Sequence, residues 1–284
     1  MTVDLLGTEP TVHFEAEVLA VAPLGESLVR VTFGGPGMRD VTTCGPDQRI
    51  KIFLPREPGA GARVPTGEDW YRRYREIPEA ERPYMRTYTI RAARPGEIDV
   101  DFVRHGDSGP ATRWAAAVKP GDRVVVYGPN ARFEDDGDPA RRGADYGAPA
   151  DASWQLIVGD ETALPAIGGI VESLAPGQRA YVFAEVPVAA DCQEWQTAGE
   201  VTVTWLPRDG APAGTSAALL AAVREADLPA EPGYAWLAGE ARQVRDLRRH
   251  LVGERGMDRK RIDFCGYWRY GKSEDAPFEP EPRD

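Results

Sequence analysis

The chain of 284 residues has few of the side chains that build metal sites and disulfide frameworks. Its three cysteines, Cys44, Cys192 and Cys265, are scattered without a CxxC or Cys/His spacing, and it has only three histidines. A disulfide framework, a zinc site and an iron–sulfur cluster are therefore disfavoured, and we expect no metal held by the protein itself. We find no Ser/His/Asp set or pair of carboxylates suited to catalysis, so we predict no catalytic side chain.

Long hydrophobic runs are also missing, since no apolar run approaches the roughly 18 residues that span a bilayer. Residues 1–10 carry two acids, no Lys or Arg and no apolar signal-peptide core. We therefore expect a cytoplasmic protein without membrane insertion, and a monomer. A net positive charge is missing as well: 45 acidic residues outnumber 34 Lys and Arg, and the net charge of −11 argues against nucleic acid as a partner, because phosphate binding needs clustered positive charge.

Hydrophobic residues are present with two different rhythms. In residues 11–132 apolar and polar residues alternate, as at 29–33 and 98–102, and Gly, Pro and Asp separate the runs. This pattern predicts several short strands in an antiparallel barrel or sandwich, with short helices at 67–82 and 110–118.

Residues 133–153 lack an apolar period and are rich in Asp, Gly, Pro and Ala, so we interpret them as a linker or long exposed loop. Beyond them, apolar runs alternate with helical patterns up to residue 272, which predicts a mostly parallel sheet covered on both faces. Strands are expected at 154–159, 180–186, 201–206, 234–238 and 261–267, and helices at 163–174, 214–225 and 240–252. The acidic, Pro-rich tail 273–284 is expected to be disordered.

Two segments of the first half have chemistry suited to a flavin. The expected strand 86–89 offers the Arg86 guanidinium to a pyrophosphate, and a Thr hydroxyl or backbone N–H to the flavin N5 edge. Residues 109–112 precede an expected helix with Pro110 in its first turn, and the free N–H groups there suit a phosphate. Taken alone, both segments are equally compatible with an ordinary strand and an ordinary helix start.

The second half has a strand that runs into a helix at residues 159–165. Thr162 is an N-cap candidate for a helix from Ala163, and a nucleotide phosphate is plausible at its start. Asp160 and Glu161 would repel a phosphate unless they point outward or bond ribose hydroxyls, so a simple capped helix is the alternative. No GxGxxG follows any expected strand, which counts against a standard Rossmann dehydrogenase.

Five segments, in order along the chain, resemble the siderophore-interacting protein family. These proteins are flavin-dependent ferric-siderophore reductases of the ferredoxin–NAD(P) reductase superfamily. The segments are residues 86–91, 100–106, 109–115, 159–167 and 266–269. The resemblance implies an N-terminal antiparallel Greek-key β-barrel for FAD (11–132) and a C-terminal Rossmann-like α/β domain for NAD(P)H (154–272). Electrons would pass from NAD(P)H through FAD to a ferric siderophore, releasing Fe(II) for intracellular use.

The same resemblance implies the site residues. FAD would contact Arg86, Thr87, Tyr88, Thr89, His105, Gly109, Ala111 and Thr112. NAD(P)H would contact Gly159, Asp160, Thr162, Ala163, Glu185, Gly239 and Glu240, where Glu185 ends a strand and could accept from ribose hydroxyls. The siderophore would meet Lys51, Arg132, Arg269 and Lys272. Tyr270 stands where family members often carry a second Arg, which leaves the siderophore open.

Alternatives remain open for the identity of the electron donor and for the class of reaction. Arg208, Arg242 and Arg245 are candidates for a 2′-phosphate and favour NADPH over NADH, although all three could be solvated surface charges. A general flavin or ferredoxin reductase on the same architecture is one alternative function. A binding protein that carries a siderophore without reducing it is the other.

Overall fold

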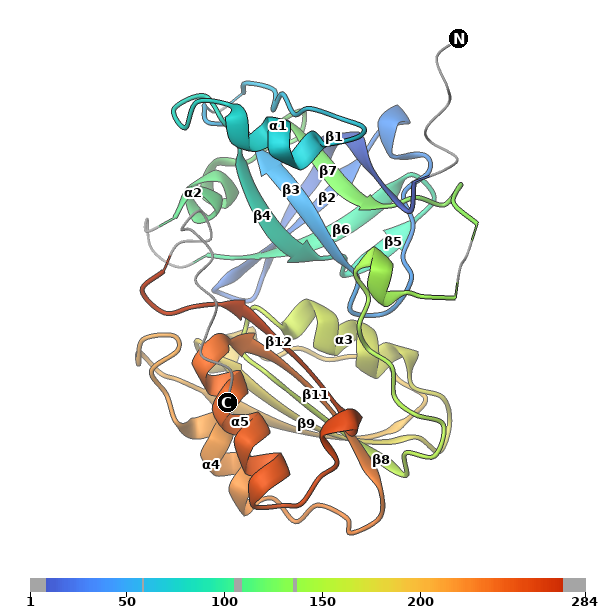
Figure 1. The fold of residues 1–284 in the computed structure, drawn as a ribbon. Coiled ribbons are helices and arrows are strands. Elements are labelled where there is room, and N and C mark those ends of the chain that lie inside the picture. Colours follow the sequence, from blue (N-terminus) through green and yellow to red (C-terminus); the bar gives the residue numbers. More distant parts are fainter. Residues whose placement is uncertain (1–8, 58, 105–108, 135–136, 273–284) are drawn as a thin grey trace.

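The computed structural model describes residues 9–57, 59–104, 109–134 and 137–272. Two halves are stacked on one another, and helix α3 lies between the lower sheet and the upper half (Figure 1). The predicted tail 273–284 lies outside the described residues. Among the helices of the described ranges, none is both long and apolar enough to cross a membrane.

The N-terminal half is a seven-stranded antiparallel sheet that curls into a half-barrel, with the order β4-β3-β7-β1-β2-β6-β5. The first half of the 14-residue β1 pairs with β7 and its second half pairs with β2, and a bulge lies between Val18 and Ala20. A bulge bends a strand, which lets β1 serve both sides of the curl. The strands are β1 (Thr11–Leu24), β2 (Leu28–Gly34), β3 (Arg49–Leu54), β4 (Tyr84–Thr89), β5 (Ala92–Arg94), β6 (Glu97–Val103) and β7 (Arg123–Pro129).

The period of two explains the packing of this half. Val31 and Phe33 of β2 face Val100 and Ile98 of β6 and are fully buried, whereas Arg30 pairs with Asp101 through two hydrogen bonds on the other face. Two short helices accompany the sheet, α1 (Trp70–Glu76) and α2 (Pro110–Ala117). Helix α1 is shorter than the predicted 67–82, and α2 is close to the predicted 110–118.

The C-terminal half is a parallel sheet with the order β10-β9-β8-β11-β12, as the alternating pattern predicts. Ile157 packs beneath α3, whereas Leu156 and Val158 belong to the cluster under α4 and α5, so both faces of the sheet are covered. The elements are β8 (Trp154–Gly159), α3 (Leu164–Ser173), β9 (Arg179–Val186), β10 (Glu200–Pro207), α4 (Ala218–Glu225), β11 (Gly233–Glu240), α5 (Ala241–Gly253) and β12 (Ile262–Trp268). Single 3-10 turns lie at Pro36–Met38, Ala140–Arg142, Ala189–Asp191 and Arg259–Arg261.

The two halves share a packed interface. Asp47, in the loop before β3, accepts hydrogen bonds from the backbone N–H groups of Asp145 (3.1 Å) and Tyr146 (2.9 Å) and from Trp236 Nε1 (3.2 Å). Arg91 forms two hydrogen bonds of 2.8 and 2.7 Å with Glu172 on α3. The expected linker is thus attached to the first half at Asp145 and Tyr146.

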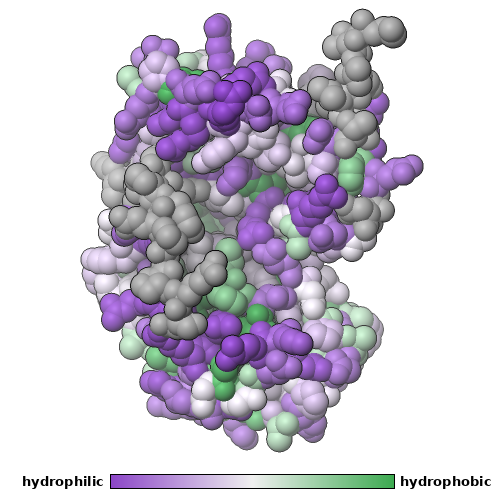
Figure 2. All heavy atoms as spheres, viewed as in Figure 1, coloured by the Kyte–Doolittle hydropathy of each residue, from purple (hydrophilic) through white to green (hydrophobic). Residues whose placement is uncertain are grey.

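The surface of the molecule reflects the same arrangement. Figure 2 shows mostly hydrophilic residues over the visible face, with the outline indented between the two halves. Leu28 and Val103 of the first half belong to the apolar cluster beneath α3, so hydrophobic packing continues from one half into the other. This continuous packing fixes the carboxyl ends of the parallel strands relative to β4.

Candidate functional site

The order of the parallel strands places a crevice at one edge of the sheet. Strand β8 lies in the centre, the chain continues to β9 on one side, and it later returns to β11 on the other. Ligands of open α/β sheets bind at the carboxyl ends of the strands where the order reverses in this way. Here that point is formed by Gly159–Thr162 after β8 and by Gly239 and Glu240 at the end of β11.

Asp160 ties the strand ends at this point together. Its carboxylate accepts hydrogen bonds from Thr162 N (2.9 Å), Glu240 N (2.9 Å) and Trp268 Nε1 (2.7 Å), and also from the Thr162 hydroxyl. The side chain points inward and the residue is 1% exposed. Burial and the neighbouring Glu161 raise the pKa of Asp160 to about 6. In this arrangement its carboxylate links the ends of β8, β11 and β12 and so supports the crevice.

The close approach of the Asp160 carboxylate to the end of β11 requires a glycine at position 239. The φ of Gly239 is +141°, and a Cβ atom there would lie 2.7 Å from Asp160 Oδ2. Both the positive φ and the close approach exclude a larger side chain. Gly239 therefore lets Asp160 reach the end of β11.

Helix α3 begins at this edge, but its cap differs from the prediction. The N-cap is Ala163 without a side-chain hydrogen bond, and Pro165 lies in the first turn as expected. The prediction of Thr162 as N-cap is wrong, because the N-cap is the next residue, and the Thr162 hydroxyl donates to Asp160 instead. For a hydroxyl donor, a buried carboxylate is a stronger hydrogen-bond acceptor than the water molecule that an exposed hydroxyl would contact. The first-turn N–H groups of α3 still lie at the end of β8, where an anion could bind.

Three charged side chains lie together where β8, β9 and β10 end at the carboxyl edge of the sheet. Arg208 donates from Nη1 (2.6 Å) and Nη2 (2.7 Å) to Glu161, and from Nη1 to Glu185 (3.3 Å). Their side chains are 5%, 3% and 0% exposed in the order Arg208, Glu161, Glu185. Burial raises the pKa of Glu185. Arg208 is therefore a buried paired cation, whereas Arg242 is exposed and Arg245 is half-buried on α5.

Strand β4 carries the predicted flavin contacts. The Arg86 side chain is buried and lies 5.7 Å from the ring of Tyr84, and the Tyr88 ring packs against Phe102 at 4.3 Å. Thr87 is exposed. Thr89 is buried at the end of β4 and its side chain lies beside that of Tyr267 on β12. This contact brings the end of β4 to the carboxyl end of the parallel sheet.

Helix α2 packs against β4 and β6. Gly109 is its N-cap in an extended conformation without a side-chain cap, and Pro110 lies in the first turn. The N–H groups of Ala111 and Thr112 belong to that first turn, whose N–H groups have no acceptor inside the helix. A buried cation on β4 and helix N–H groups on a neighbouring element are donors that fit the pyrophosphate of FAD. His105 lies outside the described residues.

The predicted siderophore residues fall in separate places. Lys51 on β3 donates from Nζ to Thr87 Oγ1 (3.2 Å), so it lies beside the flavin strand. Arg269 and Lys272 lie in one turn after β12, where Tyr270 N donates to Glu240 Oε1 (3.2 Å). Arg132 lies in a turn after β7, where its N–H donates to Asn130 Oδ1 (3.0 Å). The structure thus joins Lys51 to β4, joins Arg269 and Lys272 to the crevice, and places Arg132 in the turn after β7.

Several residues at the junction, the region where β3 and β4 meet β12, were not predicted from the sequence to have a role. Trp268 and Tyr267 lay in the C-terminal segment of the resemblance but had no predicted role. Trp268 donates a hydrogen bond to Asp160, and Tyr267 lies beside Thr89. Arg49, which begins β3, donates to Cys265 Sγ on β12 (3.3 Å) and pairs with Asp145 (2.7 Å). No sequence signal connects these residues, because their partners lie about a hundred or more positions away.

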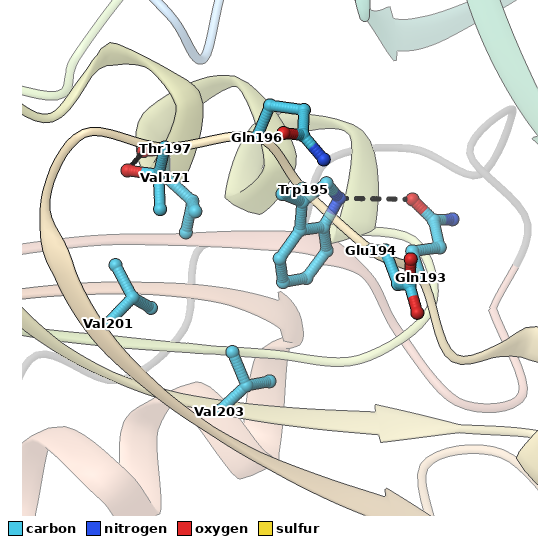
Figure 3. Close-up of a pocket in the computed structure, with 8 residues that line it drawn as sticks. All are labelled: Val171, Gln193, Glu194, Trp195, Gln196, Thr197, Val201 and Val203. Atoms are coloured by element: carbon cyan, nitrogen blue, oxygen red, sulfur yellow. Dashed lines mark hydrogen bonds between the residues drawn. The ribbon is translucent and has the colours of Figure 1, made fainter.

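A separate pocket lies on the flank of the parallel sheet, beside edge strand β10 (Figure 3). It measures about 370 Å³, and the Trp195 indole donates to Gln193 Oε1 inside it (3.3 Å). Val201 lies in the first half of β10, away from the carboxyl edge. Glu194 is its only charged lining residue, so the pocket does not suit an anionic ligand.

Known proteins share the whole of this architecture. Residues 17–133 match the model of the siderophore-interacting FAD-binding domain, and residues 152–271 match that of the siderophore-interacting protein. The chain is 30% identical to ferric vibriobactin reductase of Vibrio cholerae, over 90% of this chain and 89% of that one. It is 29% identical to an NADPH-dependent ferric-chelate reductase of Escherichia coli, over 89% and 92%.

Structural similarity leads to the same group. The crystal structure of a siderophore utilization protein from T. fusca superimposes with a TM-score of 0.79 at 32% identity, covering 94% of this chain and 96% of that one. The fold expected from the sequence, a β half for FAD followed by an α/β half, is thereby confirmed. The chain belongs to the siderophore-interacting protein family.

Proposed function

We propose that this protein is a ferric-siderophore reductase that takes electrons from NADPH or NADH and passes them through FAD to a ferric siderophore. The observation that carries the proposal is the contact between Thr89, at the end of the flavin strand, and Tyr267, at the carboxyl edge of the parallel sheet. It brings a candidate flavin site and a candidate nicotinamide site together. The names of the relatives from Vibrio cholerae and Escherichia coli support the same reaction.

Residues 11–132 would hold FAD and residues 154–272 the nicotinamide nucleotide. The bound flavin supplies the chemistry, since it accepts a hydride and can pass on single electrons. Arg86 and the first turn of α2 would bind the pyrophosphate, while Thr89 would orient the flavin edge toward β12. Gly159, Thr162 and the first turn of α3 would line the nucleotide crevice that Asp160 supports from within.

A ferric siderophore of the catecholate type is strongly anionic, and the chain itself has a net charge of −11. Local positive charge near the flavin is therefore needed to bind it. Lys51, beside Thr87, and the turn with Arg269 and Lys272 would supply that charge. Ferrous iron binds hard-oxygen siderophores far more weakly, so reduction would release the metal. We place this reaction in the cytoplasm, with the protein acting as a monomer.

The proposal is tested by reducing purified FAD-loaded protein with NADPH or NADH in the absence of oxygen, then adding a ferric catecholate and a ferrous trap. We expect the flavin bands to bleach and trap colour to form. Lys51→Gln should raise the KM for the chelate by about three- to tenfold, because one unit of attractive charge is lost. Lys119→Gln, an exposed lysine after α2, is the matched control and should leave the KM unchanged.

Other outcomes support the alternatives. Trap colour no greater than that of free flavin would contradict the siderophore assignment and favour a general flavin reductase. A protein that takes up no FAD and binds a ferric siderophore without oxidising pyridine nucleotide would be a binding protein.

A further inference from the structure

The cluster of Arg208, Glu161 and Glu185 lies where the adenosine end of a nucleotide would reach. The nicotinamide has to approach the flavin where β4 meets β12, at the contact between Thr89 and Tyr267. A dinucleotide that crosses the carboxyl edge from there extends over β8 toward β9 and β10. Its ribose at that end is the group that carries the 2′-phosphate in NADPH.

The cluster is built from three adjacent strands. Arg208 directly follows β10, and its N–H donates to the carbonyl of Val186 at the end of β9 (2.9 Å). Glu185 is the second-last residue of β9 and pairs with Leu206 of β10. Glu161 lies just after the end of β8. The backbone pairing therefore fixes all three side chains at one level of the sheet edge.

The charges of this cluster disfavour binding of the 2′-phosphate that distinguishes NADPH from NADH. Both Nη atoms of Arg208 bind Glu161, and Nη1 also reaches Glu185, so the guanidinium fork that would grip a phosphate is already occupied. Two carboxyl groups share this one cation, and burial raises the pKa of Glu185. The cluster is thus neutral or negative at neutral pH, whereas a phosphate monoester carries about −1.5 to −2 charges.

We propose that this cluster makes the reductase discriminate against the 2′-phosphate, so that NADH is preferred over NADPH. The inference rests on the proposed function and replaces the preference for NADPH that the three arginines suggested from the sequence. Arg242 and Arg245 lie on α5, which begins after β11. The cluster instead lies at the ends of β8, β9 and β10. Ribose hydroxyls, unlike a phosphate, are good donors to a carboxylate.

Binding of nucleotide fragments tests the inference without turnover. Titration calorimetry on the FAD-loaded protein compares 5′-AMP with 2′,5′-ADP, which differ only by the 2′-phosphate. We expect 2′,5′-ADP to bind about tenfold or more weakly, since like charges repel at close range. Equal or tighter binding of 2′,5′-ADP would overturn the inference.

Variants then assign the effect to the cluster. Glu161→Gln keeps the size of the side chain and removes one negative charge, so the preference for 5′-AMP should fall by about fivefold or more. Glu185→Gln should act in the same direction and serves if the first variant folds poorly. Glu254→Gln changes the net charge equally at an exposed position of the same half, and should leave the preference unchanged. A preference that is the same in both cluster variants and the wild type would assign the discrimination elsewhere and refute the proposal.

Flavin bleaching separates this inference from the proposed function. With oxygen excluded, stopped-flow traces should give a ratio of bleaching rate to nucleotide Kd that is about tenfold higher for NADH than for NADPH. Bleaching by both nucleotides with NADPH favoured leaves the reductase function intact and refutes the preference. Bleaching by neither would refute the reductase function itself.

Discussion

At the scale of single residues, two buried ionisable groups illustrate different uses of burial. Asp160 collects hydrogen bonds from the ends of β8, β11 and β12 and so holds the nucleotide crevice open from inside. His13 instead lies among aromatic rings of the β half, 4.7 Å from Tyr127 and 4.8 Å from Trp70, and burial lowers its pKa to about 4. The first group organises a site, whereas the second makes stability depend on pH.

Asp160→Asn should lower the free energy of unfolding by about 2–4 kcal/mol, because an amide N–H₂ would face donors that now reach a carboxylate. Urea denaturation followed by far-UV circular dichroism measures the change. Asp246→Asn, on the outer side of α5, is the control and should change stability by less than about 0.5 kcal/mol. A stable Asp160→Asn protein would show that water replaces the lost acceptor.

The raised pKa of Asp160 should increase stability as the pH drops from 7 to 4.5, whereas His13 should decrease it over the same range. The folded pKa of His13 lies below the usual value of 6.5, so the unfolded chain takes up a proton in this range while the folded protein does not. The loss from this residue should be about 1–2 kcal/mol after allowance for its partial exposure. His13→Phe keeps the ring contacts and removes the proton uptake, so its profile of unfolding free energy against pH should lack this loss. Parallel pH profiles of the two proteins would refute this role.

At the scale of elements, the packing of α3 against the β half depends on a missing side chain. A Cβ on Gly169 would lie 2.4 Å from the carbonyl oxygen of Pro46, in the loop before β3. The helix backbone can therefore approach this loop closely, and Arg91 reaches Glu172 on the next turn. The close approach positions the start of α3 relative to the flavin half.

Gly169→Ala should lower the free energy of unfolding by about 1–3 kcal/mol, because the backbones must separate. The intrinsic helix preference for Ala works in the opposite direction and is worth about 1 kcal/mol. Gly253→Ala, at the end of α5 with no atom near the added methyl group, isolates that preference and should be neutral or slightly stabilising. Thermal unfolding of both variants compares them, and equal melting temperatures would contradict the steric explanation.

The elements were more predictable from the sequence than the contacts between them. The apolar run at 154–159 has the bounds of β8, and the predicted helix 163–174 differs from α3 by one residue at each end. Periodicity is a local property, so one sequence reveals it. The pair of Arg208 with Glu161 spans 47 positions and forms only because β8, β9 and β10 are neighbours in the sheet. No local pattern marks such a pair.

The same reason explains the error at Thr162 and the incomplete view of residues 133–153. Thr162 is a suitable N-cap residue by type, but the acceptor that takes its hydroxyl is positioned by β11 and β12. The polar composition of 133–153 predicted a loop, whereas Asp47, about a hundred positions earlier, anchors Asp145 and Tyr146. Among the described candidate site residues, the sequence allowed the kind of side chain to be interpreted, but it did not predict which side chains contact one another.

At the scale of the whole molecule, the junction joins the halves through buried groups of both. Asp47 accepts three hydrogen bonds from the second half and the segment before it, and Arg49 bonds both Asp145 and Cys265. A chain in which two sites must face each other gains from this fixed geometry, because reacting groups held in place react faster. The halves should therefore unfold as one unit.

Asp47→Ala should separate the two unfolding events, because the buried Trp236 Nε1–H and two part-buried backbone N–H groups lose their acceptor. In wild-type protein, flavin release and loss of far-UV signal should occur at the same urea concentration. In the variant, flavin release should come first, with a total loss of about 2–4 kcal/mol. Asp227→Ala, at an exposed position after α4, is the control and should keep the two transitions together. Coincident transitions in Asp47→Ala would show that hydrophobic packing alone couples the halves.

The anchoring of the segment before β8 also bears on whether the protein needs to be one polypeptide. Gln48 Nε2 donates to the carbonyl of Arg142 and Arg49 N to that of Gly143, so the chain is held to the β half from this point onward. Arg141 directly precedes this anchored stretch and is exposed. Two co-expressed fragments divided after Arg141 should accordingly assemble into the native fold, and either fragment could then be exchanged or labelled by itself.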